Sequence, residues 1–70
     1  MTYEPKEGDV IERGRARLLV RCQSPMFKGV FFVNDYRRKW GVWHETGRRD
    51  HINQTELAVM VNHMGWRVLP

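Results

Sequence analysis

The sequence predicts an α+β domain in which an antiparallel sheet packs against one C-terminal helix, in the order strand, strand, strand, helix. Three observations predict it: an alternating segment over residues 15–23, two further runs rich in β-branched and aromatic residues, and a capped amphipathic segment near the C-terminus. A chain of 70 residues has room for one such domain. We expect residues 1–8 to form a flexible acidic arm and residues 9–70 to form the single domain.

Residues 15–23 predict the best-defined strand because side chains of two kinds alternate along them. The apolar positions, expected to face the core, are Ala16, Leu18, Val20 and Cys22. The opposite face carries Arg15, Arg17, Leu19 and Arg21. A period of two is typical of a strand that is buried on one side. The short apolar stretches 9–12 and 68–70 would make the sheet four- or five-stranded if they also pair.

The next two runs predict a hairpin. Residues 29–34 are β-branched and aromatic on both faces, and residues 40–45 follow after a short polar connection. Asn34-Asp35 offers turn chemistry, so the hairpin tip would carry the polar residues that follow it, Tyr36, Arg37, Arg38 and Lys39. Residues 46–50 are expected to form a loop. Trp40 and Trp43 have opposite parity on the predicted strand, so at least one of them would lie away from the helix.

Residues 53–65 predict a helix with marked ends. Asn53 is a favourable N-cap, and Glu56 three residues later completes a variant of the capping box. The apolar stripe at helical spacing consists of Leu57, Met60, Val61 and Met64. Gly65 is placed to adopt the left-handed conformation that ends many helices. The stripe would cover one face of the sheet and leave the other face open.

The charge of the chain is unevenly distributed. The net charge is +4, but residues 1–12 carry −3, residues 13–49 carry +8 and residues 50–70 carry −1. Nine of the 12 basic residues are arginine, whose planar guanidinium suits bidentate contacts with phosphate or carboxylate. The positive charge therefore lies within the predicted sheet and its loops, interleaved with aromatic residues.

This pattern favours a nucleic-acid interface on the open sheet face and the hairpin tip. The candidate contact residues are Arg15, Arg17, Arg21, Arg37, Arg38, Lys39, Trp40, Trp43, Arg48 and Arg49. Cations would bind phosphates while an indole stacks on a base. A two-stranded ribbon also fits the major groove, so DNA is expected ahead of RNA. The alternative is a protein-binding module, a small inhibitor or adaptor whose arginines dock on an acidic surface of a larger protein.

The sequence offers no motif for a catalytic, metal or cofactor site. Cys22 and the three histidines lack the usual zinc-ligand spacings, and no phosphate-binding loop is present. An enzyme is therefore not expected; the remaining enzymatic hypothesis is a ribonuclease using His44 or His51 beside Arg48. A single cysteine and a polar start favour a cytoplasmic protein that does not act at a membrane. With nucleic acid as its partner, we expect it to be an accessory or regulatory factor. It would be a monomer or a homodimer.

Overall fold

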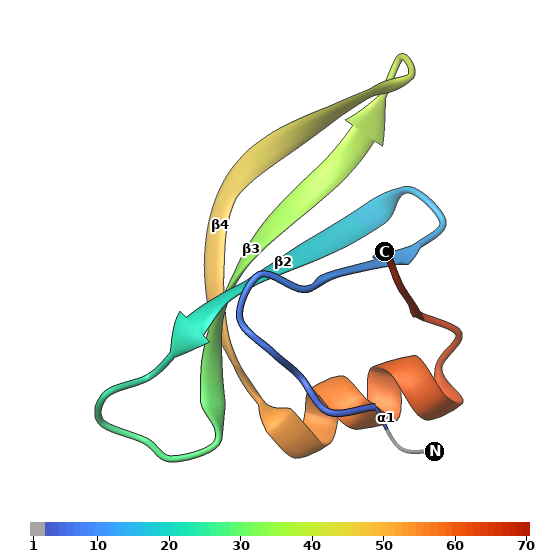
Figure 1. The fold of residues 1–70 in the computed structure, drawn as a ribbon. Helices are drawn as coiled ribbons and strands as arrows, with labels where there is room; N and C mark the ends of the chain where they lie inside the picture. Colours follow the sequence, from blue (N-terminus) through green and yellow to red (C-terminus); the bar gives the residue numbers. More distant parts are fainter. Residues whose placement is uncertain (1–2) are drawn as a thin grey trace.

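The computed structural model describes residues 3–70 and contains one antiparallel sheet with one helix. The elements follow the order β1 (Val10–Arg13), β2 (Ala16–Gln23), β3 (Val30–Lys39), β4 (Val42–Asn53), α1 (Gln54–His63) and β5 (Arg67–Val68). The sheet order is β4-β3-β2-β1-β5 (Figure 1). The predicted α+β class and the strand, strand, strand, helix order are confirmed. The short stretches at the two ends also pair, because β5 adds to β1.

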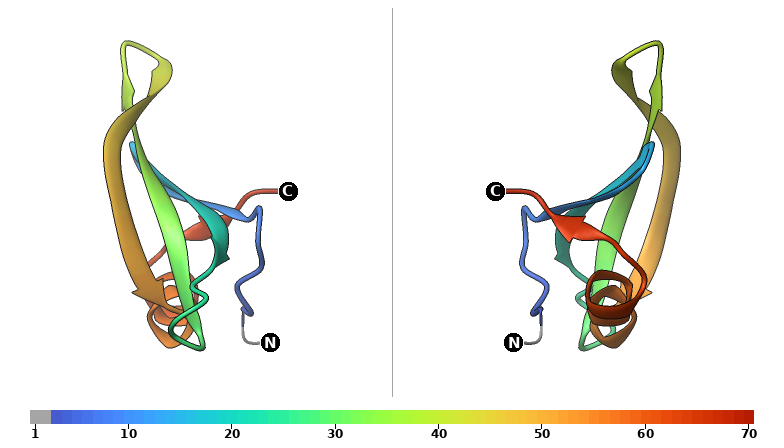
Figure 2. Two further views of the ribbon diagram at one scale, coloured as in Figure 1. Left: turned by 90° about the vertical axis from the view of Figure 1, so that its left-hand side faces the viewer. Right: turned by 90° about the vertical axis from the view of Figure 1, so that its right-hand side faces the viewer.

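The core lies between the sheet and α1. Leu18 and Val20 of β2 are buried, and their antiparallel register brings Val33 of β3 opposite Val20. Leu57 of α1 is fully buried against this cluster. The helix, the segment that precedes β1 and the segment that follows β5 lie on the same side of the curved sheet, as the views along its edge show (Figure 2). Neighbouring side chains on a strand point to opposite faces, so every second residue of the strands lies on the other face of the sheet. The helix does not cover that face.

The ends of α1 are set by local chemistry. The side-chain oxygen of Asn53 accepts a hydrogen bond of 2.7 Å from the Thr55 amide, which confirms the predicted N-cap. Gly65 has a φ of 80° and ends the helix as predicted. The prediction that Met64 belongs to the buried stripe is wrong: it is the C-cap residue, its φ of −112° is not helical, and its side chain is exposed.

The predicted position of the hairpin turn is wrong. Asn34 and Asp35 are buried within β3, where Asn34 donates to Glu45 and the Thr46 hydroxyl donates to the Asp35 carbonyl. Strand β3 instead continues to Lys39, and the chain turns at Trp40 and Gly41. Both turn residues have positive φ, 54° and 74°, as a two-residue type I′ hairpin turn requires. Strong cross-strand partners therefore overrode the local turn preference of Asn34 and Asp35.

The expected loop at residues 46–50 is part of β4. Asn34 pairs with Arg49 and Tyr36 pairs with Glu45, so three residues of β4 lie opposite Asp35 alone. This irregularity inserts two extra residues and therefore preserves which side chains face outward on either side of it. The long strand can bend here without losing its pairing with β3.

Cys22 does not face the core as predicted. The register of β2 against β3 shifts between Val20 and Cys22, so that Cys22 pairs with Phe32 and is exposed. A bulge changes the face of every residue beyond it, which an alternating pattern cannot show. The alternation therefore predicts the correct faces for residues 16–20 and the wrong face for Cys22.

The segment before β1 makes specific contacts with the domain. Tyr3 packs against the core cluster, and its hydroxyl donates a hydrogen bond of 2.7 Å to Asp9. Burial, followed by the bond to Asp9 and its negative charge, raises the pKa of Tyr3 well above its usual range. The Gly8 amide donates to the Val20 carbonyl at 2.7 Å. Within residues 3–70, no helix has the length and apolar character needed to cross a bilayer.

Candidate nucleic-acid interface

The sheet face turned away from α1, here called the outer face, carries an apolar strip at its centre. A hollow there is lined by Val10, Leu19, Tyr36 and Trp43 together with Arg17. The residues come from four strands, and the register brings Arg17 opposite Tyr36. Each of these side chains is partly buried. The outer face therefore combines apolar area with positive charge, where the sequence alone suggested a mainly basic surface.

Arg17 is held in place by two partners. Its guanidinium lies 4.0 Å from the ring centre of Trp43, and its Nε donates to Glu12 at 3.1 Å. Arg67 donates to the other Glu12 oxygen at 2.9 Å. Partial burial opposes ionisation of Glu12, but the hydrogen bonds from Arg67 and Arg17 outweigh it and hold the pKa of this carboxyl below its usual range. Arg17 thus positions the indole of Trp43 and is partly neutralised.

A second group of predicted residues lies beside the bulges in β2 and β4. Arg21 and Arg49 line a hollow with Phe32 and His51, whose rings are 4.6 Å apart. Arg48 forms a long ion pair of 3.7 Å with Asp50, while most of its side chain remains exposed. Arg21 and Arg49 therefore border an aromatic pair that the sequence analysis did not single out.

The hairpin tip is the most exposed part of the site. Arg37 is the last residue of β3 that pairs with β2, where it lies opposite Ala16. Beyond Arg37, β3 and β4 pair mainly with each other. One further bond joins the Arg38 amide to the Arg15 carbonyl at 3.0 Å. The end of the hairpin projects from the rest of the sheet (Figure 1). At the tip, 98% of the Trp40 surface is exposed, as is 56% of Val42.

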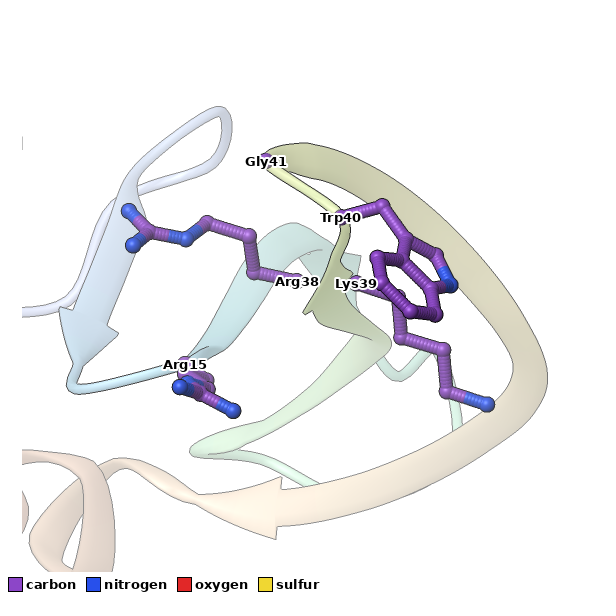
Figure 3. A pocket seen from close by; sticks show the side chains of 5 residues that line it. All are labelled: Arg15, Arg38, Lys39, Trp40 and Gly41. Atoms are coloured by element: carbon purple, nitrogen blue, oxygen red, sulfur yellow. The ribbon is translucent and has the colours of Figure 1, made fainter.

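Three cations lie at the hairpin tip with Trp40. Arg15, Arg38 and Lys39 line a shallow depression with Trp40 and Gly41. Figure 3 shows the side chains of Arg38 and Arg15 on one side of the hairpin and those of Lys39 and Trp40 on the other. Within residues 3–70 no carboxylate pairs with any of these three cations. Arg37 differs, because its Nε lies 3.5 Å from Asp35.

The structure therefore divides the predicted contact residues among three places. The hairpin tip and its base hold Arg15, Arg37, Arg38, Lys39 and Trp40; the apolar strip holds Arg17 and Trp43; the region of the bulges holds Arg21, Arg48 and Arg49. Sequence reasoning missed the apolar residues Val10 and Val42, and it placed Tyr36 at the hairpin tip although Tyr36 lies in the apolar strip. The one signal of the apolar strip in the sequence was Leu19, the single apolar residue on the basic side of its strand.

The histidines do not converge on one point. His44 lies opposite Arg37, which pairs with the core-facing Ala16, whereas His51 lies opposite Phe32 on the outer face. The two histidines therefore lie on opposite faces of β4. Among residues 3–70, no three histidine, cysteine or carboxylate side chains gather as metal ligands would.

The chain was compared with models of protein families, with curated proteins and with solved structures, and none of the three comparisons found a match.

Proposed function

We propose that the protein binds nucleic acid through its hairpin tip and outer face, as an accessory or regulatory factor, with DNA expected ahead of RNA. The hairpin tip is the observation that carries the proposal. Trp40 is almost wholly exposed beside Arg15, Arg38 and Lys39. An indole in this position adds nothing to the core, although burying it would stabilise a small domain. Its exposure among unpaired cations supports a role in contacting a negatively charged partner with a surface for stacking.

The cations divide into two classes by their availability. Arg15, Arg38 and Lys39 can bind phosphates directly because no ion pair in residues 3–70 has to break. The side chains of Arg37 and Arg48 are 56% and 72% exposed despite their carboxylate partners. Exposed ion pairs of this kind add little stability, so both arginines can exchange a carboxylate for a phosphate. Arg17 instead supports Trp43 as a second aromatic contact.

We propose binding without catalysis. The hairpin tip is lined by Arg15, Arg38, Lys39 and Trp40, cations and an indole that suit phosphate and base contacts. The hollow beside the bulges contains one histidine, His51, and the register places His44 on the opposite face of β4. RNA and DNA incubated with the purified protein should therefore remain intact.

Salt-dependent titration tests the proposal. Labelled 20-nucleotide single strands and duplexes are titrated at 50 and 200 mM salt, and wild type is compared with a double Arg38→Ala/Lys39→Ala variant. If both side chains contact duplex phosphates, the slope of log K against log salt should fall by about 2, because each contact contributes roughly 0.9. Lys28→Ala is the matched control, since Lys28 is exposed in the loop at the other end of the molecule. Equal effects of the two changes would contradict the assignment of the tip.

One observation favours the alternative of a protein-binding module. The apolar strip of Val10, Leu19, Tyr36 and Trp43 resembles the centre of a protein interface, where aromatic residues dominate the affinity. The arginines around it would then steer an acidic partner. A protein that binds neither single-stranded nor duplex DNA or RNA at 50 mM salt would remove the leading proposal and leave this one.

A further inference from the structure

We infer that the β3–β4 hairpin enters a groove of duplex DNA and that Trp40 inserts at a weakened base step as a wedge. This inference rests on the proposed function and names the form of nucleic acid that the tip would recognise. Apolar side chains that wedge between base pairs unstack them and bend the duplex. Three properties of the hairpin carry the inference: its reach, the charge on its two faces and the chemistry of its tip.

The projecting part of the hairpin is long enough to cross a groove. Beyond Arg37 and His44, which are paired where β2 begins, two more residues on each strand lead to the turn residues Trp40 and Gly41. A strand rises by about 3.3 Å per residue, so the three steps from Arg37 to Trp40 extend the ribbon roughly 10 Å beyond the pairing with β2. The grooves of B-DNA are about 7.5 to 8.5 Å deep. The indole of Trp40 would therefore reach the base pairs while the rest of the sheet stays outside the phosphate backbones.

The hairpin carries cations on both of its faces. Arg37 and Lys39 lie on one face of β3, and Arg38 lies between them on the other. Figure 3 shows Arg38 and Lys39 pointing to opposite sides. A groove has a phosphate backbone along each wall, so a ribbon with cations on both faces can contact both strands. A single strand has only one backbone and would leave half of this charge unused.

The turn at the end of the hairpin, residues 40–42, is apolar. Trp40 and Val42 are its exposed side chains, and Gly41 has no side chain to obstruct their approach to a base step. A turn without carboxylate, amide or guanidinium groups has little means of reading base edges by hydrogen bonds. It can recognise a step that opens easily. Opening a step costs least where a base pair is mismatched, so we expect a preference for such sites over fully paired DNA.

The backbone conformation of Trp40 is a further indication that its indole has a function at the tip. Trp40 has a φ of 54°, in the left-handed region that bulky residues seldom occupy. Asparagine, aspartate and glycine favour this position of a type I′ turn, whereas tryptophan is not among the preferred residues. The chain therefore holds its most exposed aromatic where the turn chemistry alone would favour a small polar residue.

Binding and bending measured together test the inference. The probes are three DNAs of the same sequence: a fully paired 20-base-pair duplex, the same duplex with one central mismatch, and the single strand, with donor and acceptor dyes at the duplex ends. Wild type is compared with Trp40→Asn, which keeps the turn favourable while removing the indole. Trp40→Phe is the conservative variant. The matched control is Phe27→Ala, which removes an aromatic that is 63% exposed in the loop before β3.

We expect wild type to bind the mismatched duplex about tenfold more tightly than the paired one and to bring its ends closer together. Trp40→Asn should lose both effects while keeping salt-dependent binding, Trp40→Phe should retain part of each, and Phe27→Ala should match wild type. Unchanged mismatch preference and bending in Trp40→Asn would overturn the wedge. Tightest binding to the single strand, lost in Trp40→Asn, would replace the wedge with single-strand stacking. Binding to none of the three DNAs or their RNA counterparts would overturn the proposed function itself.

Discussion

At the scale of single residues, the two tryptophans of the hairpin show how position decides what an aromatic can do. Trp43 is partly buried on the outer face, where the Arg17 guanidinium stacks on its ring at 4.0 Å. Trp40 lies three residues earlier and is 98% exposed at the turn. The first indole contributes to the sheet surface and the second does not. A substitution at Trp40 should therefore separate folding from binding.

Replacing Trp40 by asparagine should raise the free energy of unfolding by about 0.5–1 kcal/mol, because asparagine tolerates the left-handed conformation better than tryptophan. Urea unfolding monitored by circular dichroism measures the change. Trp43→Asn is the comparison and should destabilise the domain, since it removes a packed ring. A loss of stability in Trp40→Asn would show that the indole makes contacts that stabilise the fold.

At the scale of elements, the helix and the β3–β4 hairpin were predicted with unequal success. The helix between Asn53 and Gly65 was predicted closely because capping and helix termination depend on residues adjacent in sequence. The β3–β4 turn was predicted wrongly because it depends on cross-strand partners. Asn34 and Asp35 would favour a turn in isolation, but Glu45 and Thr46 satisfy their polar groups within the sheet.

The N-cap gives a test at this scale. Asn53→Ala should lower the free energy of unfolding by about 0.5–2 kcal/mol, because the Thr55 amide loses its side-chain partner. Thermal or urea unfolding measures the loss. Asn62→Ala, an exposed position inside the same helix, is the control and should be neutral or slightly stabilising, since alanine is the better helix former. A neutral Asn53→Ala would mean that the cap contributes nothing to stability.

At the scale of the whole molecule, the acidic and basic parts of the chain are joined at Glu12. This carboxylate of β1 accepts from Arg17 of β2 and from Arg67 of β5, so it ties together the three strands at one edge of the sheet. The two ion pairs also lie at the margin of the outer face. Glu12 therefore holds β1 to β2 and β5 and, through Arg17, also helps to position Trp43.

Glu12 predicts a loss of stability in acid. Its pKa is lower in the folded protein than in the unfolded chain, so its contribution is present above the usual carboxyl pKa of about 4.3 and is lost as the pH falls through the lower folded value. Glu12→Gln should be less stable than wild type at pH 7, and the two should converge in acid. Urea unfolding at several pH values measures this. Glu4→Gln, exposed in the N-terminal arm, is the control, and a constant gap between Glu12→Gln and wild type at all pH values would contradict the prediction.

The candidate site was predicted in composition but not in arrangement. The structure places Arg15, Arg38, Lys39 and Trp40 together at the hairpin tip, where they line one depression. Arg21 and Arg49 lie apart from them, in the hollow beside the bulges, and Arg17 contacts Glu12 and Trp43. A linear pattern shows how many cations a strand carries. It does not show which of them a carboxylate from another strand neutralises, because such partners are distant in sequence.

The sequence by itself determined the α+β class, the faces of residues 16–20 and the ends of the helix. Each depends on interactions between residues a few positions apart: alternation along a strand, a capping side chain and a glycine at a helix end. Only the tertiary structure decided where the hairpin turns, which face Cys22 takes and which cations stay unpaired. Those features depend on the register between strands, where one bulge or one cross-strand carboxylate changes the surroundings of residues that local pattern treats as equivalent.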